Sequence, residues 1–233
     1  MYDSSDFFVI DMHVHSFCSD GLHSPDALVK YAKRKGLNGI AIVDHAPKVD
    51  IDVIVKRRFK LYKHAFDMAD FVVLPGIEFS FPEGHLLAIF PDFDCDFSFG
   101  EVSCIGDLYG VVKDFDGLLI AAHIYRRSGL RDKVLKYIDY LDALEVYPPS
   151  RRFNFAKELN IPRVAGSDSH TSLTLGFAVT VFRNQPASIY DVLKLIKSGE
   201  VYPLFFKPYF LRRVLDCFRW FSPTYILKRA DVC

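Results

Sequence analysis

Histidines and carboxylates recur beside short apolar runs along the chain, where several side chains together could bind metal ions. His13 and His15 follow the apolar run 7–10, and Ser19-Asp20-Gly21 forms the next turn. The complete set is His13, His15, Asp20, His45, Glu78, His85, His123, Asp168 and His170. Mixed nitrogen and oxygen donors of this kind suit Zn²⁺, Mn²⁺ or Fe²⁺. The set therefore predicts a site for divalent metal ions.

A single histidine after a strand is more often structural than a metal ligand. Six of the eight histidines, however, lie beside predicted strand ends, which makes coincidence a poor explanation. His23 and His64 lie elsewhere, and we expect structural roles for both. Asp11 and Asp44 each stand just before a histidine of the set, where they either orient its imidazole or form a strand-end turn.

Short apolar runs alternate with amphipathic stretches, as in a sheet whose strands are connected by helices. We expect strands over residues 7–13, 39–44, 71–79, 85–90, 117–123, 143–147, 163–168 and 177–182, and helices over 24–36, 51–69, 98–113, 132–141, 151–160 and 188–197. Ser24 and Ser188 are the predicted caps of two of these helices.

The strands are apolar on both faces, which indicates a parallel sheet covered on both sides. A closed or nearly closed α/β barrel fits this number of strands best, and a doubly wound open sheet is the alternative. In such a barrel, side chains at the C-terminal ends of the parallel strands meet at one face. The fold class therefore predicts that the histidines and carboxylates converge.

The whole-chain numbers describe an ordinary globular protein. Its 233 residues are 50% apolar, 25% charged and formally neutral, so nothing points to nucleic acid or an anionic membrane as a partner. The five cysteines form no CxxC pair, which argues against a thiolate zinc site. Acidic residues near the N-terminus argue against a signal peptide, and no apolar run reaches membrane-spanning length. We expect a cytoplasmic protein.

The motifs occur in an order that resembles the polymerase and histidinol phosphatase (PHP) superfamily. They are His-x-His with Ser-Asp-Gly, then Asp44-His45, Gly76-Ile-Glu78, the strand-end His123, and Gly166-Ser-Asp-Ser-His170. The resemblance covers roughly residues 9–182. It implies a distorted (β/α)7 TIM-like barrel of PHP type, formed by residues 1–200 as a single domain. Residues 201–233 then form an aromatic, basic C-terminal extension that we expect to pack on the barrel.

The resemblance also implies two to three divalent ions, as Zn, Mn or Fe. The first would be held by His13, His15, Glu78 and Asp168. Glu78 would bridge to a second ion held by His85 and His123. Asp20, His45 and His170 would hold a third. Two of these residues, Asp168 and His170, could also relay a proton to the leaving group.

The implied activity is a metal-dependent phosphoesterase that hydrolyses a small phosphomonoester or nucleotide. Bound metal lowers the pKa of water enough to supply hydroxide near neutral pH, and phosphate recognition favours the forked donors of arginine. Arg126 and Arg127 follow His123, and Arg152 lies at the next loop, so these are the expected substrate-binding residues. Lys48, Arg57 and Arg58 are weaker candidates.

Three other functions are open at this point. An exonuclease could trim short RNA or DNA ends with the same chemistry. A non-catalytic partner subunit could use the barrel as a platform, with the apolar stripe 210–218 docking on a partner, a membrane surface or a second copy in a homo-oligomer. Amide hydrolysis, which similar metal barrels perform, is the last alternative.

Overall fold

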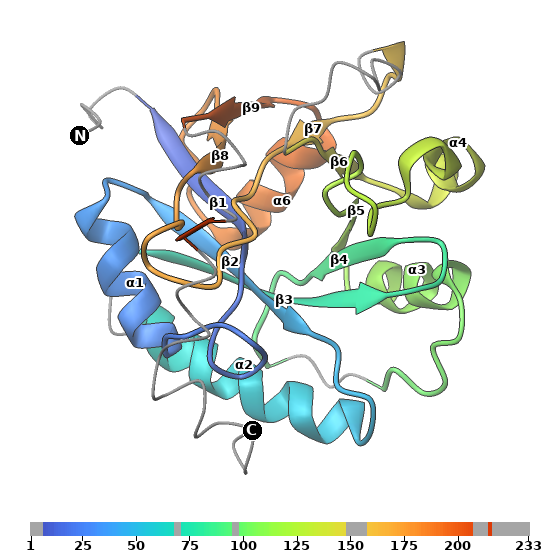
Figure 1. Ribbon diagram of the computed structural model, residues 1–233, viewed down its shortest axis with the longest axis horizontal. Coiled ribbons are helices and arrows are strands. Elements are labelled where there is room, and N and C mark those ends of the chain that lie inside the picture. Colours follow the sequence, from blue (N-terminus) through green and yellow to red (C-terminus); the bar gives the residue numbers. More distant parts are fainter. Residues whose placement is uncertain (1–6, 68–70, 95–97, 148–157, 207–213, 216–233) are drawn as a thin grey trace.

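A single sheet organises the residues that the computed structural model describes, which are 7–67, 71–94, 98–147, 158–206 and 214–215. The strand order is β7-β6-β5-β4-β3-β2-β1-β8-β9 (Figure 1). The strands are β1 (Phe8–Val14), β2 (Gly39–His45), β3 (Val72–Ser80), β4 (His85–Ile89), β5 (Leu118–Ala121), β6 (Ala143–Glu145), β7 (Arg163–Val164), β8 (Ala178–Phe182) and β9 (Val201–Phe205).

The sheet curls into a nearly closed barrel because residues 165–169, which follow β7, return to β1. The amide of His15 donates to the carbonyl of Ser169 at 2.9 Å, and the amide of Ser169 donates to the carbonyl of His13 at 3.2 Å. Val14 and Ser169 form a parallel bridge at this seam. The first half of β1 pairs instead with β8. This arrangement confirms the predicted α/β barrel in place of the open alternative.

The prediction of a parallel sheet is wrong at two of the expected strands, β4 and β8, and β9, which was not expected, is also antiparallel. β1, β2 and β3 are parallel, as are β5, β6 and β7, but β4 is antiparallel to both of its neighbours. β8 and β9 are also antiparallel to the strands beside them. β4 reverses because a tight turn joins it to β3, with mutual backbone hydrogen bonds between Phe81 and Gly84 at 3.1–3.2 Å. A short turn can only connect antiparallel strands.

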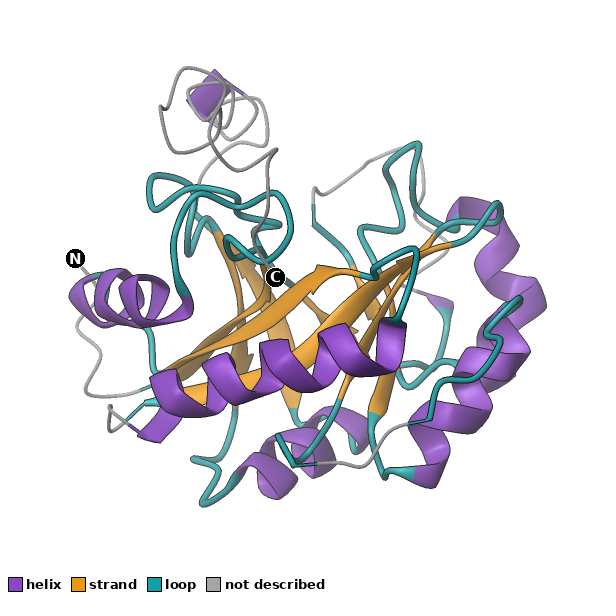
Figure 2. Cartoon of the chain, turned by 90° about the horizontal axis from the view of Figure 1, so that it is seen from below, coloured by secondary structure: helices purple, strands orange, loops and turns teal. Residues whose placement is uncertain are grey.

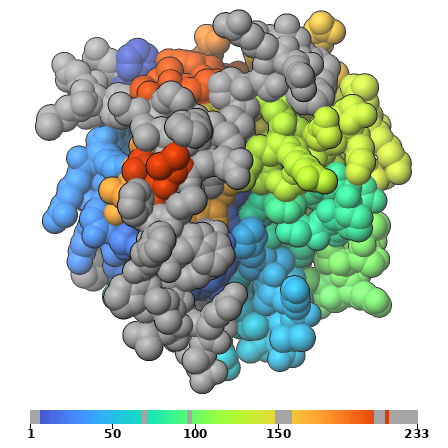
Figure 3. All heavy atoms as spheres, viewed as in Figure 1, coloured from blue at the N-terminus to red at the C-terminus, as the bar shows by residue number. Residues whose placement is uncertain are grey.

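The helices lie around the outside of the sheet, and the longest of them, α2, runs along the strands (Figure 2). They are α1 (Pro25–Arg34), α2 (Ile51–Asp67), α3 (Ile105–Asp114), α4 (Val134–Tyr137) and α6 (Ile189–Lys197), with the 3₁₀ turns η1 (Arg131–Lys133) and η2 (Ile138–Tyr140). In the space-filling view, the blue residues of α1 lie on one side of the molecule and the green residues of α3 and α4 lie on the other (Figure 3). No described helix is long and apolar enough to cross a membrane.

Caps explain where several helices begin. The Ser24 and Ser188 hydroxyls accept hydrogen bonds from the Ala27 amide at 3.3 Å and the Asp191 amide at 3.1 Å, as the sequence predicts. α3 begins at Ile105, later than expected, because the Asp107 carboxylate accepts from two amides of the preceding turn at 3.0 Å. The expected helix at 132–141 is divided into η1, α4 and η2, and most of the one at 151–160 lies outside the described residues.

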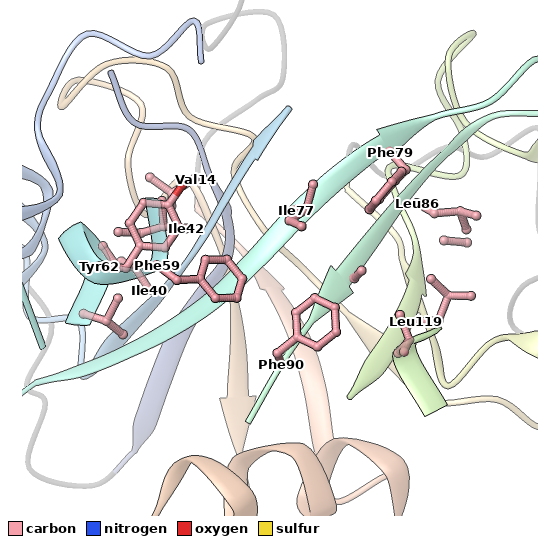
Figure 4. Packing of buried hydrophobic residues seen from close by; sticks show 14 of the residues in the cluster. Val14, Ile40, Ile42, Phe59, Tyr62, Ile77, Phe79, Leu86, Phe90 and Leu119 are labelled. Atoms are coloured by element: carbon pink, nitrogen blue, oxygen red, sulfur yellow. The ribbon is translucent and has the colours of Figure 1, made fainter. Parts of the chain in front are cut away.

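Two apolar layers hold the sheet in place. The inner layer fills the barrel with alternate strand residues, including Ile10, Met12, Ala41, Val43, Leu74, Leu87, Ile89, Leu118, Ile120 and Ala143. α6 adds Val192, Leu193 and Ile196 to this layer, so it covers the end of the barrel where β1 and β3 begin. The outer layer packs the other strand face against α1, α2 and α3; Ile40, Ile42, Phe59, Ile77, Phe90 and Leu119 belong to it (Figure 4).

The first residues of the expected C-terminal extension form part of the sheet. β9 pairs with β8 from Val201 to Phe205, and the Phe205 ring stacks on Tyr147 with centroids 5.6 Å apart. Within the expected apolar stripe, only Val214 and Leu215 are described, both as helical. The rest of the stripe lies outside the described residues, so its role stays a prediction.

Candidate metal centre

A β-bulge in β1 turns its two histidines into the barrel. Between Asp11 and Val14 the register with β2 shifts by one residue. Met12 belongs to the inner apolar layer and Val14 to the outer one, so His13 and His15 face inwards on the far side of the bulge. Bulges commonly re-aim side chains beside functional sites. The alternation of His13 and His15 thus places both rings in one cavity.

Regular strand alternation places three further ligand candidates in the same cavity. His45 shares the inner face of β2 with Val43, and His85 shares that of β4 with Leu87. Glu78 lies on the inner face near the end of β3. The reversal of β4 decides the position of His85, because the start of an antiparallel strand lies at the edge where its parallel neighbours end. His85 and Glu78 are therefore within contact distance, at 2.9 Å.

Two other site residues depend on left-handed backbone conformations. His123 has φ of 29° and Asp168 has φ of 51°, values that non-glycine residues adopt at a cost and often at functional sites. Ala122 already faces inwards, so simple alternation would turn the next residue outwards. At Gly166 the seam is so close that an added Cβ would lie 2.4 Å from the backbone nitrogen of His13.

The Glu78 carboxylate lies between two sets of histidines. Its Oε2 atom is 3.6 Å from His13 Nε2 and 3.3 Å from His15 Nε2. Its Oε1 atom is 2.9 Å from His85 Nδ1 and 3.1 Å from His123 Nε2. Oε2 also lies 3.0 Å from His45 Nδ1, so one oxygen faces three imidazoles and the other oxygen faces a separate pair.

Asp168 and Asp20 complete the cluster. Asp168 Oδ1 is 3.2 Å from His15 Nε2 and 3.6 Å from His13 Nε2. Asp20 Oδ1 is 3.1 Å from His170 Nε2, and 3.6 Å from His45 Nε2. Ligand atoms lie within 4.8 Å of one another in three groups: His13 with His15 and Asp168; Glu78 with His85 and His123; and His15 with Asp20, His45 and His170. All nine predicted residues are brought together.

The buried carboxylates favour positive charge on the rings between them. Burial opposes protonation of His13 and His15, but the carboxylates outweigh it: Glu145, Asp168 and Glu78 raise the pKa of His13 well above its ordinary value. Hydrogen bonds to Asp168 and Glu78 raise the pKa of His15 to about 10. Burial acts against ionisation of Glu78, yet His13 and the other rings hold its pKa well below the usual range.

Burial and neighbouring charges shift the pKa values of three other residues of the cluster. Burial lowers the pKa of both His123 and His170, with the neighbouring His15 adding to the effect at His170. Burial would raise the pKa of Asp20, but its hydrogen bond to His170 and the charge of His15 lower it instead. The pocket thus combines ionised carboxylates with two rings, His13 and His15, whose protonated form is favoured and two, His123 and His170, whose neutral form is favoured. Divalent cations fit this donor set, because they supply positive charge among the carboxylates without protons.

Glu145 is a site residue that the sequence reasoning missed. It is fully buried on β6, and its Oε2 atom lies 3.0 Å from His13 Nδ1. The same oxygen accepts the His123 backbone amide at 2.7 Å. Metal-binding histidines usually donate their second nitrogen to such an oxygen. The signal was present, since Glu145 is the charged residue within the apolar strand Ala143-Leu-Glu-Val-Tyr147.

Asp11 and Asp44 hold loops and do not orient imidazoles. The Asp11 carboxylate accepts from the Ser167 amide and hydroxyl at 2.8 and 2.6 Å, and from the Gly176 amide at 2.8 Å. Asp44 accepts from the amide of Ser16 at 2.7 Å and from its hydroxyl at 2.5 Å. Of the two readings left open by the sequence, the turn role is the one observed.

The predicted phosphate-binding residues differ in whether they reach the cluster. The Arg126 guanidinium forms an ion pair with Asp168 and so reaches the cluster. Arg127 is exposed, and Arg152 lies outside the described residues. Lys48 and Arg57 are also exposed.

Arg58 and the two remaining histidines have structural contacts or lie on the surface. Arg58 is buried and donates to the carbonyls of His45 at 2.7 Å and Cys18 at 2.6 Å, so it binds backbone and not an anion. His23 packs on Tyr31 with centroids 4.9 Å apart, and His64 is exposed on α2.

Comparison with solved structures finds the same fold at low sequence identity. A two-domain protein containing a predicted PHP-like metal-dependent phosphoesterase from Bacteroides vulgatus ATCC 8482 has a TM-score of 0.69 and 20% identity, over 87% of this chain and 66% of that one. The lesion-specific endonuclease PfuEndoQ from Pyrococcus furiosus has a TM-score of 0.64 and 17% identity, over 84% and 57%. This chain thus spans less than two thirds of either protein.

A smaller neighbour is an amidohydrolase from Chromobacterium violaceum, with a TM-score of 0.54 and 15% identity over 83% of this chain and 97% of that one. The curated proteins contain no match to this sequence. Family profiles do match: the PHP-associated profile over residues 151–201, and the PHP domain profile over residues 11–145. Since the second match covers more than half of the chain, the protein belongs to the PHP domain family.

Proposed function

We propose that this protein hydrolyses a small phosphomonoester, such as a sugar phosphate or a nucleotide, at a centre of three divalent ions. The observation that carries the proposal is the position of Glu78. Its two oxygens face separate sets of histidines at 2.9–3.6 Å, with three rings at Oε2 and two at Oε1, as expected for a carboxylate that bridges two ions. Two-metal sites of this kind are used for phosphate ester hydrolysis.

Three sets of residues would hold the ions. His13, His15 and Asp168 with one Glu78 oxygen form the first, and His85 and His123 with the other oxygen form the second. Asp20, His45 and His170 form the third. Divalent ions bound there would lower the pKa of water from about 15.7 to about 7 and would neutralise phosphate charge.

The surroundings of His170 favour a role as ligand over that of proton relay. Its Nδ1 atom lies 3.0 Å from the backbone carbonyl of Asp168, which can only accept. With a proton on Nδ1 donated to this carbonyl, the neutral ring would offer Nε2, which lies 3.1 Å from Asp20 Oδ1, to an ion. The Asp168 side chain, which lies between the histidines and Arg126, is then the better candidate for moving a proton to the leaving group.

Arg126 is the proposed phosphate-binding residue of this site. Its guanidinium contacts Asp168, whose other oxygen faces His13 and His15. The guanidinium of an arginine beside a metal cluster can donate two parallel hydrogen bonds to two phosphoryl oxygens. Arg127 and Arg152 remain proposals of lower rank because Arg127 is exposed and nothing described supports Arg152.

The test is hydrolysis by metal-free protein reconstituted with Mn²⁺ or Zn²⁺. We expect phosphate release from p-nitrophenyl phosphate and from at least one member of a panel of sugar phosphates and nucleotides. His85→Ala should abolish it, whereas His64→Ala, an exposed histidine on α2, should not. Protein that binds its ions but releases no phosphate from any compound would overturn the proposal. Turnover of N-acyl substrates would instead indicate an amide hydrolase.

A nuclease is the second candidate, favoured by the likeness to PfuEndoQ at a TM-score of 0.64. The same metal groups could cleave a phosphodiester, and the exonuclease form predicts mononucleotide release from short RNA or DNA. End-labelled oligonucleotides distinguish the two functions. A ladder of shortened products that is lost in His13→Ala would favour the nuclease over the phosphomonoesterase.

A further inference from the structure

The Asp20–His45–His170 group differs from the other two in how it is supported. Its members Asp20 and His45 are 31% and 38% exposed at their side chains, whereas the members of the other groups range from 0% at His13 to 24% at His85. Asp20 lies on the loop after β1 and not on a strand. The barrel interior therefore cannot fix this group by packing, and its geometry depends on contacts that hold the loop and the end of β2.

Asp44 holds the loop from the outer face of the sheet. It alternates with His45, so its carboxylate points away from the cavity while His45 points into it. The carboxylate accepts from the Ser16 amide at 2.7 Å, the Ser16 hydroxyl at 2.5 Å and the Ser19 hydroxyl at 2.5 Å. Ser19 directly precedes Asp20, so these bonds fix the chain beside the ligand.

Two residues of α2 complete this support. Arg58 donates one nitrogen to the His45 carbonyl at 2.7 Å and another to the Cys18 carbonyl at 2.6 Å. Tyr62, one turn further on the same helix face, donates its hydroxyl to Asp44 at 2.5 Å. Figure 4 shows the Tyr62 ring beside Ile42 of β2. Arg58 therefore ties together the two segments that carry ligands of this group.

We propose that Arg58 and Tyr62 are positioning residues that set the affinity of the Asp20–His45–His170 group for its ion more strongly than they affect the two other groups, which share His15 and a His45–Glu78 contact at 3.0 Å with it. The inference rests on the proposed metal-binding role of the nine residues. It is based on which segments α2 contacts: Arg58 and Tyr62 form hydrogen bonds to the loop 16–20 and to the end of β2. The buried groups instead take their support from Glu145 and from the seam between β1 and residues 165–169.

The competing explanation is that both residues only pack α2 against the sheet. Phe59 allows the two to be separated, because it is buried on the same helix and packs on Tyr62 and Phe90, with centroids 5.7 and 6.0 Å apart. Its side chain is a hydrocarbon and so cannot form a hydrogen bond to the loop. Phe59→Leu is therefore a control for loss of helix packing.

The experiment measures bound Zn²⁺ by elemental analysis at a series of fixed free-metal concentrations. We expect three ions in the wild type, and a roughly 10–100-fold weaker affinity for one of them in Tyr62→Phe and Arg58→Met, as for other residues that support metal ligands. Arg58→Lys, which keeps one donor nitrogen in place of two, should retain part of the affinity. Phe59→Leu should lower Tm while keeping three ions.

A double variant identifies the ion concerned. His170→Ala should lose the ion of the exposed group, and adding Tyr62→Phe should then change the affinities of the remaining two by less than about twofold. Equal weakening of all three ions in Tyr62→Phe, unchanged binding in that variant, or only two ions in the wild type would each overturn the inference. Selective loss of one ion in a protein that hydrolyses no phosphate ester would overturn the proposed function alone.

Discussion

The Glu145 carboxylate lies 3.0 Å from the Nδ1 atom of His13, on the opposite side of the ring from Glu78 and Asp168. A carboxylate acceptor at Nδ1 fixes the tautomer and leaves Nε2 as the metal-binding atom. It also makes the ring a stronger electron donor. Because the same Glu145 oxygen accepts the His123 amide, one side chain supports two of the proposed metal groups.

Glu145→Gln should weaken metal binding at both buried groups by about 10–100-fold, because an amide is a weaker acceptor than a carboxylate. Competition with a chromophoric chelator measures the affinities. Glu101→Gln removes an exposed carboxylate and serves as the matched control. Unchanged affinities in Glu145→Gln would show that Glu145 only fills space.

Gly166→Ala should destabilise the barrel seam. The added Cβ would lie 2.4 Å from the His13 nitrogen and 2.7 Å from Glu145 Oε1, so backbone must move. We expect a loss of about 1–3 kcal/mol in the free energy of unfolding, read from urea titration, together with reduced metal content. Gly110→Ala is the control, since nothing lies within 4 Å of its Cβ position inside α3; it should stabilise by about 0.5–1 kcal/mol. A stable, fully metallated Gly166→Ala variant would contradict the close approach.

Metal binding should release protons at neutral pH. The pKa of His15 is raised to about 10 in the metal-free site, so this ring is protonated at pH 7. A ligand imidazole must be neutral, and the proton leaves as the ion enters. Apparent affinity should therefore rise with pH below about 10 and fall as pH drops. Calorimetric titration in buffers of different ionisation enthalpy measures the proton count, and a binding heat independent of buffer would contradict it.

Arg126→Met should raise KM for a phosphomonoester by about tenfold or more, because a hydrogen bond to a charged group contributes about 1.5–3 kcal/mol. Inorganic phosphate should become a weaker competitive inhibitor to the same extent. Metal content is measured in parallel, since Arg126 also contacts Asp168. The exposed Arg127→Met is the control, and equal KM values in the two variants would remove Arg126 from substrate binding.

Simple alternation along strands accounts for much of what the sequence could predict. His45 and Glu78 follow inward-facing residues at a two-residue period, so their direction can be read from the pattern. The strand-end position of the other ligands was also visible. The ligands meet at one face only if the strands form a barrel, and the order of the apolar runs was sufficient to predict that barrel.

The rest depends on backbone features that residue patterns do not encode. His13 and His15 face inwards only because of a bulge, and His123 and Asp168 adopt left-handed conformations. The reversal of β4 could have been inferred from the four-residue connection between Ser80 and His85, which is too short for a parallel crossover. Glu145 was overlooked because a lone acid in an apolar strand has no motif around it.

The seam between β1 and residues 165–169 also has a consequence for the order of events during protein synthesis. His13 and His15 leave the ribosome about 150 residues before Asp168 and His170, which complete their groups. Loop closure over such a span is slow relative to local folding. A nascent chain therefore carries His13 and His15 long before their group is complete. We expect tight metal binding to begin only when the barrel closes.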